Sequence, residues 1–248
     1  MTIESVVVCV NYGDFLEHTL PENLKQLDRV VVVTHPDDKI TQRICNQYGV
    51  DFLTTTIMHE DGDALNKGRL INLGLSHLKH TDWLVQLDAD ILLPHNFRSM
   101  LKKAKLNKRC IYGMDRLNTV NFDHWQAYKG ASVPQHQWRY LTIPNKHFPM
   151  GARLTHSEYG WCPIGYFQLW HSSMRRTYSI INGSAEHSDV MFAVQWPRED
   201  RILLPEMFCY HLESGDETFG KNWNGRKTKP FGSNSNNKKE QSVKYCKE

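Results

Sequence analysis

The chain has 248 residues and a formal net charge of +3, with 40% hydrophobic and 23% charged residues. This composition is typical of a soluble globular enzyme and supplies enough apolar residues for a sizeable core. No apolar run approaches the roughly 20 residues that cross a bilayer, and no secretory signal is recognisable at the start. The net charge is too small to indicate a nucleic-acid partner by itself.

Six cysteines are scattered along the chain, and no two of them form a CxxC pair. This spacing favours reduced structural thiols over a zinc site or a disulfide framework. We therefore expect a cytoplasmic protein without a membrane anchor.

Strand and helix patterns alternate over residues 1–95. Continuous apolar runs such as SVVVCV and RVVVVT indicate strands that are buried on both faces. The expected strands are 5–10, 29–34, 50–55 and 83–87. The first expected helix starts at Thr19 and Pro21 and carries Leu20, Leu24 and Leu27. The second carries Ile40, Ile44 and Tyr48, and the third spans 66–78. The alternation predicts an α/β fold with a mostly parallel sheet and helices on both of its faces.

The second half of the chain is less regular. Residues 124–163 are rich in aromatic residues, Pro, Gly and His, which is typical of long loops over a sheet edge. Further strands are expected at 163–170 and 201–205. Residues 232–248 are polar and of low complexity, which predicts a flexible tail. Without internal repeats or a clear linker, we expect one domain over 1–231.

The stretch WLVQLDADILLP places two carboxylates, Asp88 and Asp90, at the end of a buried strand. Side-chain alternation points both the same way, toward the sheet edge where α/β proteins bind ligands. Like charges repel there unless a cation compensates them. Oxygen ligands suit Mg²⁺ or Mn²⁺, which also bind phosphates. The alternative is a solvated turn that caps the following helix.

At this point the sequence resembles the GT-A glycosyltransferases, in particular the family 2-like and galactosyltransferase-like group and its compact phage-encoded members. The matching segments are VVVCVNYGDFLEHTL, VVVTHPDD, NKGRLINLGL, WLVQLDADILLP, HSDVMFAVQW and YHLES, with GYFQLWH and KNWNGR for the phage-type members. The resemblance implies a single-domain, Rossmann-like GT-A fold, with a nucleotide-sugar-binding half at 1–95 and an irregular acceptor-binding half at 96–231. A phage-encoded member would act in the host cytoplasm.

The resemblance also implies contacts to a nucleotide-diphosphate sugar, for which a UDP-sugar is favoured. The loop after the first strand, Val10, Asn11 and Tyr12, would contact the base, and Asp37 or Asp38 the ribose or base. Lys67 and Arg69 would approach the phosphates, and Asp88 the ribose. The alternatives are an ordinary strand-end aromatic at Tyr12, a polar turn at Asp37 and Asp38, and a solvated helix surface at Lys67 and Arg69.

The same resemblance implies a Mn²⁺ or Mg²⁺ site made by Asp90 and His211, with Asp88 nearby. Three further residues, Lys221, Trp223 and Arg226, would close over the diphosphate and sugar as a lid. A plain solvated charge cluster is the alternative for the lid residues.

For catalysis, the resemblance implies an acidic residue that deprotonates the acceptor hydroxyl. Asp189 is the first candidate and Glu186 the second, and a single displacement assisted by Asp189 predicts inversion at the anomeric carbon. A helix N-cap is the alternative role for Asp189.

The acceptor is expected to be a hydroxymethylated pyrimidine in DNA or a saccharide. The expectation uses the mixture of aromatic and basic residues in the 125–161 region, which suits stacking and phosphate contacts, and the lysines of the tail. These residues are Trp125, Tyr128, Lys129, Trp138, Arg139, Tyr140, Lys146, Phe148, Arg153, Tyr159 and Trp161, then Lys238, Lys239, Lys244 and Lys247. A nucleotidyltransferase and a non-catalytic binding protein are the competing classes, although no Gly-rich, Arg-containing phosphate loop follows the first strand. The oligomeric state is not indicated.

Overall fold

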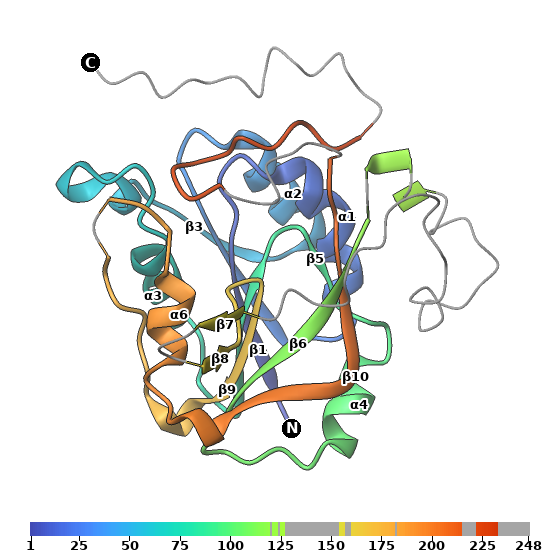
Figure 1. The fold of residues 1–248 in the computed structure, drawn as a ribbon. Coiled ribbons are helices and arrows are strands. Elements are labelled where there is room, and N and C mark those ends of the chain that lie inside the picture. Colours follow the sequence, from blue (N-terminus) through green and yellow to red (C-terminus); the bar gives the residue numbers. More distant parts are fainter. Residues whose placement is uncertain are drawn as a thin grey trace.

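The computed structural model describes residues 1–119, 121–123, 125–126, 154–156, 160–181, 183–214 and 222–232. The strands of its main sheet are β1 (Ile3–Val8), β2 (Arg29–Thr34), β3 (Asp51–Thr54), β4 (Trp83–Asp88), β5 (Ile91–Leu92), β6 (Ile111–Asn118), β9 (Phe167–His171) and β10 (Arg201–His211). Their order across the sheet is β3-β2-β1-β4-β9-β6-β10-β5 (Figure 1). A separate hairpin pairs β7 (Leu154–His156) with β8 (Gly160–Cys162).

The first four strands form a parallel block, because each is followed by a connection that returns to the amino end of the sheet. The helices are α1 (Gly13–Asn23), α2 (Lys39–Tyr48), α3 (Lys67–Ser76), α4 (Phe97–Lys103) and α6 (Ser188–Ala193). Short 3₁₀ helices lie at η1 (Ile57–Gly62), η3 (Ser172–Met174) and η4 (Arg198–Asp200).

Side chains of the parallel block alternate between two cores. Val7, Val32 and Val85 belong to a buried cluster with Leu16 of α1 and Ile44 of α2. On the opposite face, a second cluster combines the neighbouring strand residues with α3 and α6. Its members include Val6, Val31, Leu84, Leu70, Leu75 and Phe192. The predicted sheet with helices on both faces is therefore confirmed.

In the second half of the chain, β9 lies antiparallel between β4 and β6, and β6 then pairs in parallel with β10. The short strand β5 pairs antiparallel with the end of β10. The sheet is thus mixed, with four parallel and three antiparallel neighbours. In the described part of the chain, no helix has both the length and the apolar character needed to cross a membrane.

The expected start of the first helix is wrong. The helix begins at Gly13, and Pro21 lies inside it rather than at its start. Proline deprives the Glu17 carbonyl of an N–H donor, but the loss is tolerated here because the helix ends at Asn23. Burial of Phe15, Leu16 and Leu20 fixes the helix against the sheet.

Other boundaries also differ from expectation. The strand expected at 163–170 begins only at Phe167, after a turn, and the strand expected at 201–205 continues as β10 to His211. Neither β6 nor α4 was predicted. Most of the region 124–163, and the tail beyond Gly232, lie outside the described residues.

Candidate active site

The candidate site lies where the carboxyl ends of β1 and β4 meet the end of β10. Asp88 is the last residue of β4 and pairs in register with Val8 of β1. On the other side, His211 at the end of β10 pairs with Ile91 of β5, immediately after Asp90. The Leu212 N–H also donates to the Asp90 carbonyl at 2.9 Å. Backbone pairing therefore brings His211 to the acidic turn.

Asp90 and His211 form a buried ion pair. The Asp90 Oδ2 atom lies 3.3 Å from His211 Nε2, and Glu213 Oε1 lies 2.8 Å from His211 Nδ1. Burial alone would lower the pKa of His211, but the Asp90 carboxylate outweighs it and the pKa rises to about 9. A row of three polar side chains, Asp90, His211 and Glu213, thus crosses this edge of the sheet.

Asp88 has a different partner. Lys67, the first residue of α3, places Nζ 2.5 Å from Asp88 Oδ1, and Gln86 Nε2 donates to the same oxygen at 2.9 Å. Burial lowers the pKa of Lys67, yet the Asp88 carboxylate raises it above its usual value, with smaller contributions from Asp189 and Asp90. The Lys67 ammonium therefore compensates Asp88, while Asp90 is paired with His211, so each of the two neighbouring carboxylates has its own cationic partner.

The residues present fit a divalent cation at Asp90 and His211. Asp90 Oδ1 is buried and has no hydrogen-bond partner among the described residues, so one acceptor oxygen is available to a cation. His211 Nε2 faces Asp90 Oδ2 in the ion pair, so the imidazole would have to release its proton to become a ligand. Carboxylate oxygens suit Mn²⁺ and Mg²⁺. Glu213 stands where an outer-shell carboxylate would orient the His211 ring. Within the described ranges, no group of three or more His, Cys, Asp or Glu side chains is already arranged to hold a metal.

Asp189 lies in the first turn of α6, as the sequence predicted. Its Oδ2 accepts the Gly165 N–H at 2.7 Å and its Oδ1 accepts the Val190 N–H at 2.8 Å. A side chain at position 165 would press on this carboxylate, because an added Cβ would lie 2.9 Å from Asp189 Cβ. The buried Gln168 amide donates to the Asp189 carbonyl at 3.0 Å. Main-chain and side-chain contacts thus fix the position of the carboxylate.

Glu186 is placed differently. Its side chain is 40% exposed and lies 3.6 Å from the imidazole of His187, in the segment before α6. Its backbone N–H donates to Ser184 Oγ at 3.2 Å.

The loop after β1 is held by Asp38. The backbone of Asn11 adopts a left-handed conformation with φ of 60°, and its N–H donates to Asp38 Oδ2 at 2.6 Å. Asp38 is also the N-cap of α2, where it accepts the N–H of Thr41 at 3.1 Å and its hydroxyl at 2.8 Å. The buried carboxylate of Asp38 is therefore engaged in holding the loop and helix.

Asp37, in contrast, is largely exposed. Its side chain is 63% accessible and lies 3.6 Å from His35 Nδ1. Of the two acidic residues expected near the ribose, Asp37 is the one whose carboxylate points to solvent. The Arg69 guanidinium is paired with Glu60, at 2.6 Å, and with Asp61, both in η1.

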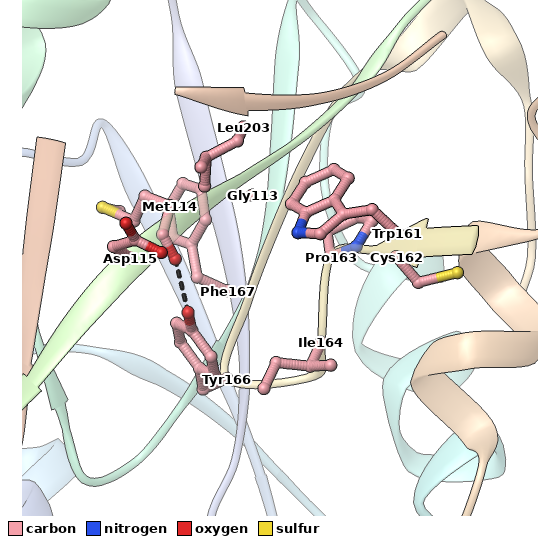
Figure 2. Close-up of a pocket in the computed structure, with 10 residues that line it drawn as sticks. All are labelled: Gly113, Met114, Asp115, Trp161, Cys162, Pro163, Ile164, Tyr166, Phe167 and Leu203. Atoms are coloured by element: carbon pink, nitrogen blue, oxygen red, sulfur yellow. Dashed lines mark hydrogen bonds between the residues drawn. The ribbon is translucent and has the colours of Figure 1, made fainter. Parts of the chain in front are cut away.

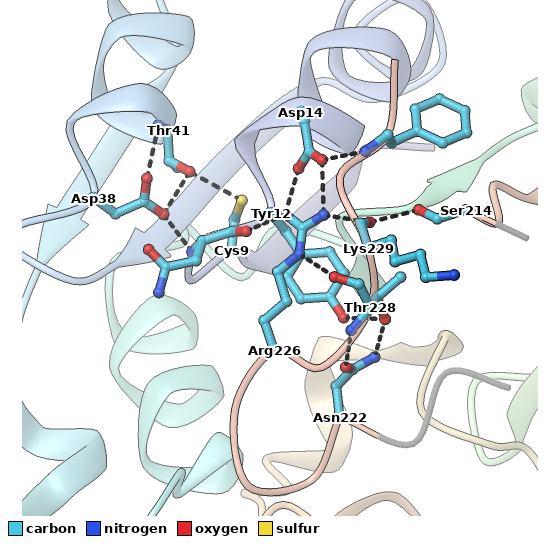
Figure 3. A network of polar contacts seen from close by, with 12 residues as sticks. Cys9, Tyr12, Asp14, Asp38, Thr41, Ser214, Asn222, Arg226, Thr228 and Lys229 are labelled. Atoms are coloured by element: carbon cyan, nitrogen blue, oxygen red, sulfur yellow. Dashed lines mark hydrogen bonds and ion pairs between the residues drawn. The ribbon is translucent and has the colours of Figure 1, made fainter. Parts of the chain in front are cut away.

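The Arg226 guanidinium is bound within the protein in this structure. Figure 3 shows it between Asp14 and the backbone of its own segment. It contacts both Asp14 oxygens at 2.6 and 2.7 Å, the Asn11 carbonyl, and the Thr228 and Lys229 carbonyls at 2.9 and 2.8 Å. A guanidinium has five N–H donors, and all five are used here. Trp223 is 40% exposed, and Lys221 lies outside the described residues.

A small hollow lies beside the turn that carries Gly165. Its ten lining residues come from β6, β8, β9, β10 and the turn before β9 (Figure 2). Trp161 forms one wall, while Tyr166 on the other donates its hydroxyl to the Met114 carbonyl. The hollow reaches Ile164 and Tyr166, on either side of the glycine that binds Asp189. Of the aromatic residues expected at the acceptor side, only Trp125 and Trp161 lie in the described part of the chain.

Sequence reasoning missed three supporting residues. Gln86 and Glu213 each lie two positions from a candidate residue, Asp88 and His211. This spacing puts them on the same face of an extended chain and could have identified them. Asp14 gave no comparable signal, because its arginine partner lies 212 residues away.

No protein-family model matches the chain, and no curated protein matches its sequence. Among solved structures, the fold is similar to S. aureus TarS 1-349 with a TM-score of 0.55 at 14% identity, over 86% of this chain and 60% of that one. It is also similar to glucosyl-3-phosphoglycerate synthase from Mycobacterium tuberculosis, solved in complex with Mn²⁺, UDP-glucose and phosphoglyceric acid. That match has a TM-score of 0.51 at 13% identity, over 85% of this chain and 71% of the other. The chain thus spans about 60% of the length of the first structure. These likenesses establish a GT-A type of fold, as the sequence predicted.

Proposed function

We propose that this protein is a metal-dependent glycosyltransferase, which moves a sugar from a nucleotide-diphosphate sugar to an acceptor hydroxyl. The observation that carries the proposal is the Asp90–His211 pair at the carboxyl edge of the sheet, where Asp90 Oδ1 has no hydrogen-bond partner among the described residues. Asp88, Asp189 and Asp90 all lie near enough to the Lys67 ammonium to raise its pKa. The fold supports the proposal, since one protein that shares it was solved with Mn²⁺ and UDP-glucose.

In this proposal the donor lies across the ends of β1 and β4. The loop after β1 contacts the nucleobase through Val10, Asn11 and Tyr12, and Asp37 contacts the ribose or base. A UDP-sugar is the favoured donor. In the free protein the Lys67 ammonium forms an ion pair with Asp88. When the donor binds, this ammonium contacts a donor phosphate instead. Asp88 then becomes available to the ribose.

Asp90 and His211 would hold the Mn²⁺ or Mg²⁺ ion, with Glu213 orienting the imidazole. The ion would supply Lewis-acid stabilisation of the negative charge that develops on the leaving diphosphate. Lys67 adds a second positive charge at the same place.

Asp189 is the proposed base. Its carboxylate accepts the proton of the acceptor hydroxyl, the hydroxyl oxygen forms a bond to the anomeric carbon, and the bond between that carbon and the diphosphate oxygen breaks. A single displacement of this kind inverts the anomeric configuration. The two N–H donors on Asp189 orient its oxygens before the acceptor arrives. Glu186 is the second candidate for this role.

For the acceptor we propose a hydroxymethylated pyrimidine of DNA, with a saccharide as the alternative. The indole of Trp161, which lines the hollow beside the Gly165 turn, supports an acceptor that is at least partly flat, because it offers an aromatic surface there. A base within duplex DNA would have to leave the stack to reach this position. A cytoplasmic location belongs to the same proposal.

The test is a panel of nucleotide sugars incubated with Mn²⁺ or Mg²⁺, hydroxymethylated DNA and oligosaccharides. Release of a nucleoside diphosphate together with sugar transfer supports the proposal, and the acceptor that gains mass identifies the acceptor class. Release of pyrophosphate instead would identify a nucleotidyltransferase. Asp189→Asn should abolish transfer but retain donor binding. Asp51→Asn, at the far end of the sheet on β3, is the matched control and should retain both.

A further inference from the structure

We propose that Arg226 is a positioning residue, which holds the loop 10–12 in the conformation that receives the donor nucleobase. The inference rests on the proposed function, because it takes that loop as part of the donor site. The segment that carries Arg226, residues 222–232, is here called the strap. It lies along the start of α1 (Figure 1, Figure 3).

The strap is fastened to α1 through one carboxylate. Both oxygens of Asp14 bind the Arg226 guanidinium, and Asp14 Oδ2 also accepts the Phe231 N–H at 2.6 Å. The Asp14 and Arg226 side chains are only 8% and 11% exposed. A buried, bidentate pair of this kind is directional, and removing one partner leaves a buried charge without compensation.

The Arg226 guanidinium also binds the loop 10–12 directly. Its Nη1 donates to the Asn11 carbonyl, while the Asn11 N–H is held from the other side by Asp38. The peptide groups on both sides of the Asn11 Cα are thus fixed, at a residue with a φ of 60°, a left-handed conformation that asparagine adopts more readily than most residues. We infer that these two bonds are what keep the loop in this conformation.

Tyr12 is fixed as well. Its ring lies under the Arg226 guanidinium, 4.7 Å from the centroid, and its hydroxyl lies 3.1 Å from Thr228 Oγ1. One face of the ring is therefore covered by the strap. Tyr12 acts as part of the wall of the base site, and a nucleobase can stack only on its other face.

The opposite end of the strap contacts the catalytic side. The N–H of Ala185, which lies four residues before Asp189, donates to the Trp223 carbonyl at 2.9 Å. The Asn222 side chain accepts the N–H groups of Lys227 and Thr228 at 2.7 and 3.1 Å and so folds the strap into a compact turn. The strap therefore connects the loop after β1 with the segment that leads into α6.

The experiment compares Arg226→Ala, Arg226→Lys and Asp14→Asn with the wild-type protein. Arg29→Ala is the matched control, because Arg29 makes a single ion pair with Asp51 at 2.8 Å on the far strands of the sheet. The first measurement is amide hydrogen exchange of the free protein at Phe15, Leu16 and Phe231. The second is the Kd of the nucleoside diphosphate that binds the wild type best among UDP, GDP, CDP and dTDP with Mn²⁺, together with donor KM and kcat.

We expect exchange at these amides to rise at least tenfold in Arg226→Ala and Asp14→Asn. The nucleotide Kd and the donor KM should rise about tenfold, with kcat changed less than threefold. Lysine offers three donors instead of a planar set of five, so Arg226→Lys should not restore binding. The effect of the Arg226→Ala/Asp14→Asn double variant on the nucleotide Kd should be smaller than the sum of the two single effects, because each substitution already removes the ion pair.

If Arg226→Ala does not fold, Thr228→Val provides a milder test, since it removes only the Thr228 hydroxyl, which contacts Tyr12 and accepts from Asn222 Nδ2 at 2.7 Å; it should raise the nucleotide Kd two- to fivefold. Faster exchange with an unchanged Kd in the variants that fold would show a purely structural strap and overturn the inference. Unchanged exchange would overturn it too. Failure of the wild-type protein to bind any of the four nucleotides would overturn the proposed function as well, so the two failures are distinguishable.

Discussion

Replacing Gly165 by alanine should displace the proposed base without removing any catalytic group. The backbone at Gly165 does not have a positive φ, so alanine is compatible with its conformation. The added methyl group would lie 2.9 Å from Asp189 Cβ, 3.2 Å from its Oδ2 and 3.4 Å from its Cγ. Carbon atoms in contact prefer a separation of about 3.5–4.0 Å, so the Asp189 side chain must move by about 0.5–1 Å.

This displacement sets the expected size of the effect. An error of about 1 Å in the position of a reacting group can reduce the rate about 100-fold. We therefore expect kcat to fall about 10- to 100-fold. Overpacking of this kind costs about 1–3 kcal/mol of unfolding free energy, which most domains survive.

The assay measures kcat at saturating donor and acceptor, nucleotide affinity, and urea unfolding. Gly74→Ala is the control, because Gly74 lies within α3 and its methyl group would press on a Val6 methyl at 2.5 Å and a Val33 methyl at 3.0 Å instead of on Asp189. It should lose comparable or greater stability yet keep the kcat of the folded protein. A Gly165→Ala enzyme with full kcat, or one that loses nucleotide affinity instead, would refute the placement of Asp189 as base.

Three further predictions concern the metal, the donor loop and acid stability. His211→Ala should weaken Mn²⁺ binding in the presence of UDP at least about tenfold by calorimetry, and unchanged affinity would exclude it as a ligand. Asp38→Ala should lower the unfolding free energy by about 2–3 kcal/mol, because it removes an N-cap and leaves buried donors unpaired. Asp37→Ala should leave stability unchanged and raise the donor KM. If instead Asp37→Ala lowers stability and Asp38→Ala raises only the donor KM, Asp38 contacts the donor and Asp37 holds the loop. Burial raises the pKa of Asp28, but its bonds to Arg98 and the backbone outweigh this and leave the pKa below the usual 3.8. Since the folded-state pKa is the lower one, this stabilisation exists at neutral pH and disappears as the pH falls below about 3.8; Asp28→Asn should flatten that part of the acid-unfolding curve.

The parallel half of the sheet was predictable because its strands are buried on both faces and therefore appear as continuous apolar runs. The same logic located the acidic turn, since ligands of such sheets bind at the carboxyl ends of the strands. The first helix was misplaced because Pro21 is a common helix start, whereas here burial of Phe15 and Leu16 decides where the helix lies.

Roles that depend on distant partners were not predictable. Asp37 and Asp38 are adjacent and chemically equal in the sequence, and only the fold turns Asp38 inward to Thr41 and Asn11. The family resemblance implied that Arg226 belongs to a lid over the diphosphate. The saturation of Arg226 by Asp14 and backbone carbonyls depends on tertiary contacts that no local pattern contains.

The position of β9 bears on how the chain can be synthesised. When residues 1–95 have left the ribosome, β1 to β4 can already pair, yet β4 then has an uncovered, apolar edge, because its second neighbour begins only at Phe167. Uncovered edges of this kind recruit other strands and promote aggregation. The nascent chain must therefore pass through an interval in which chaperone protection, or rapid completion of translation, decides how much of it reaches the native state.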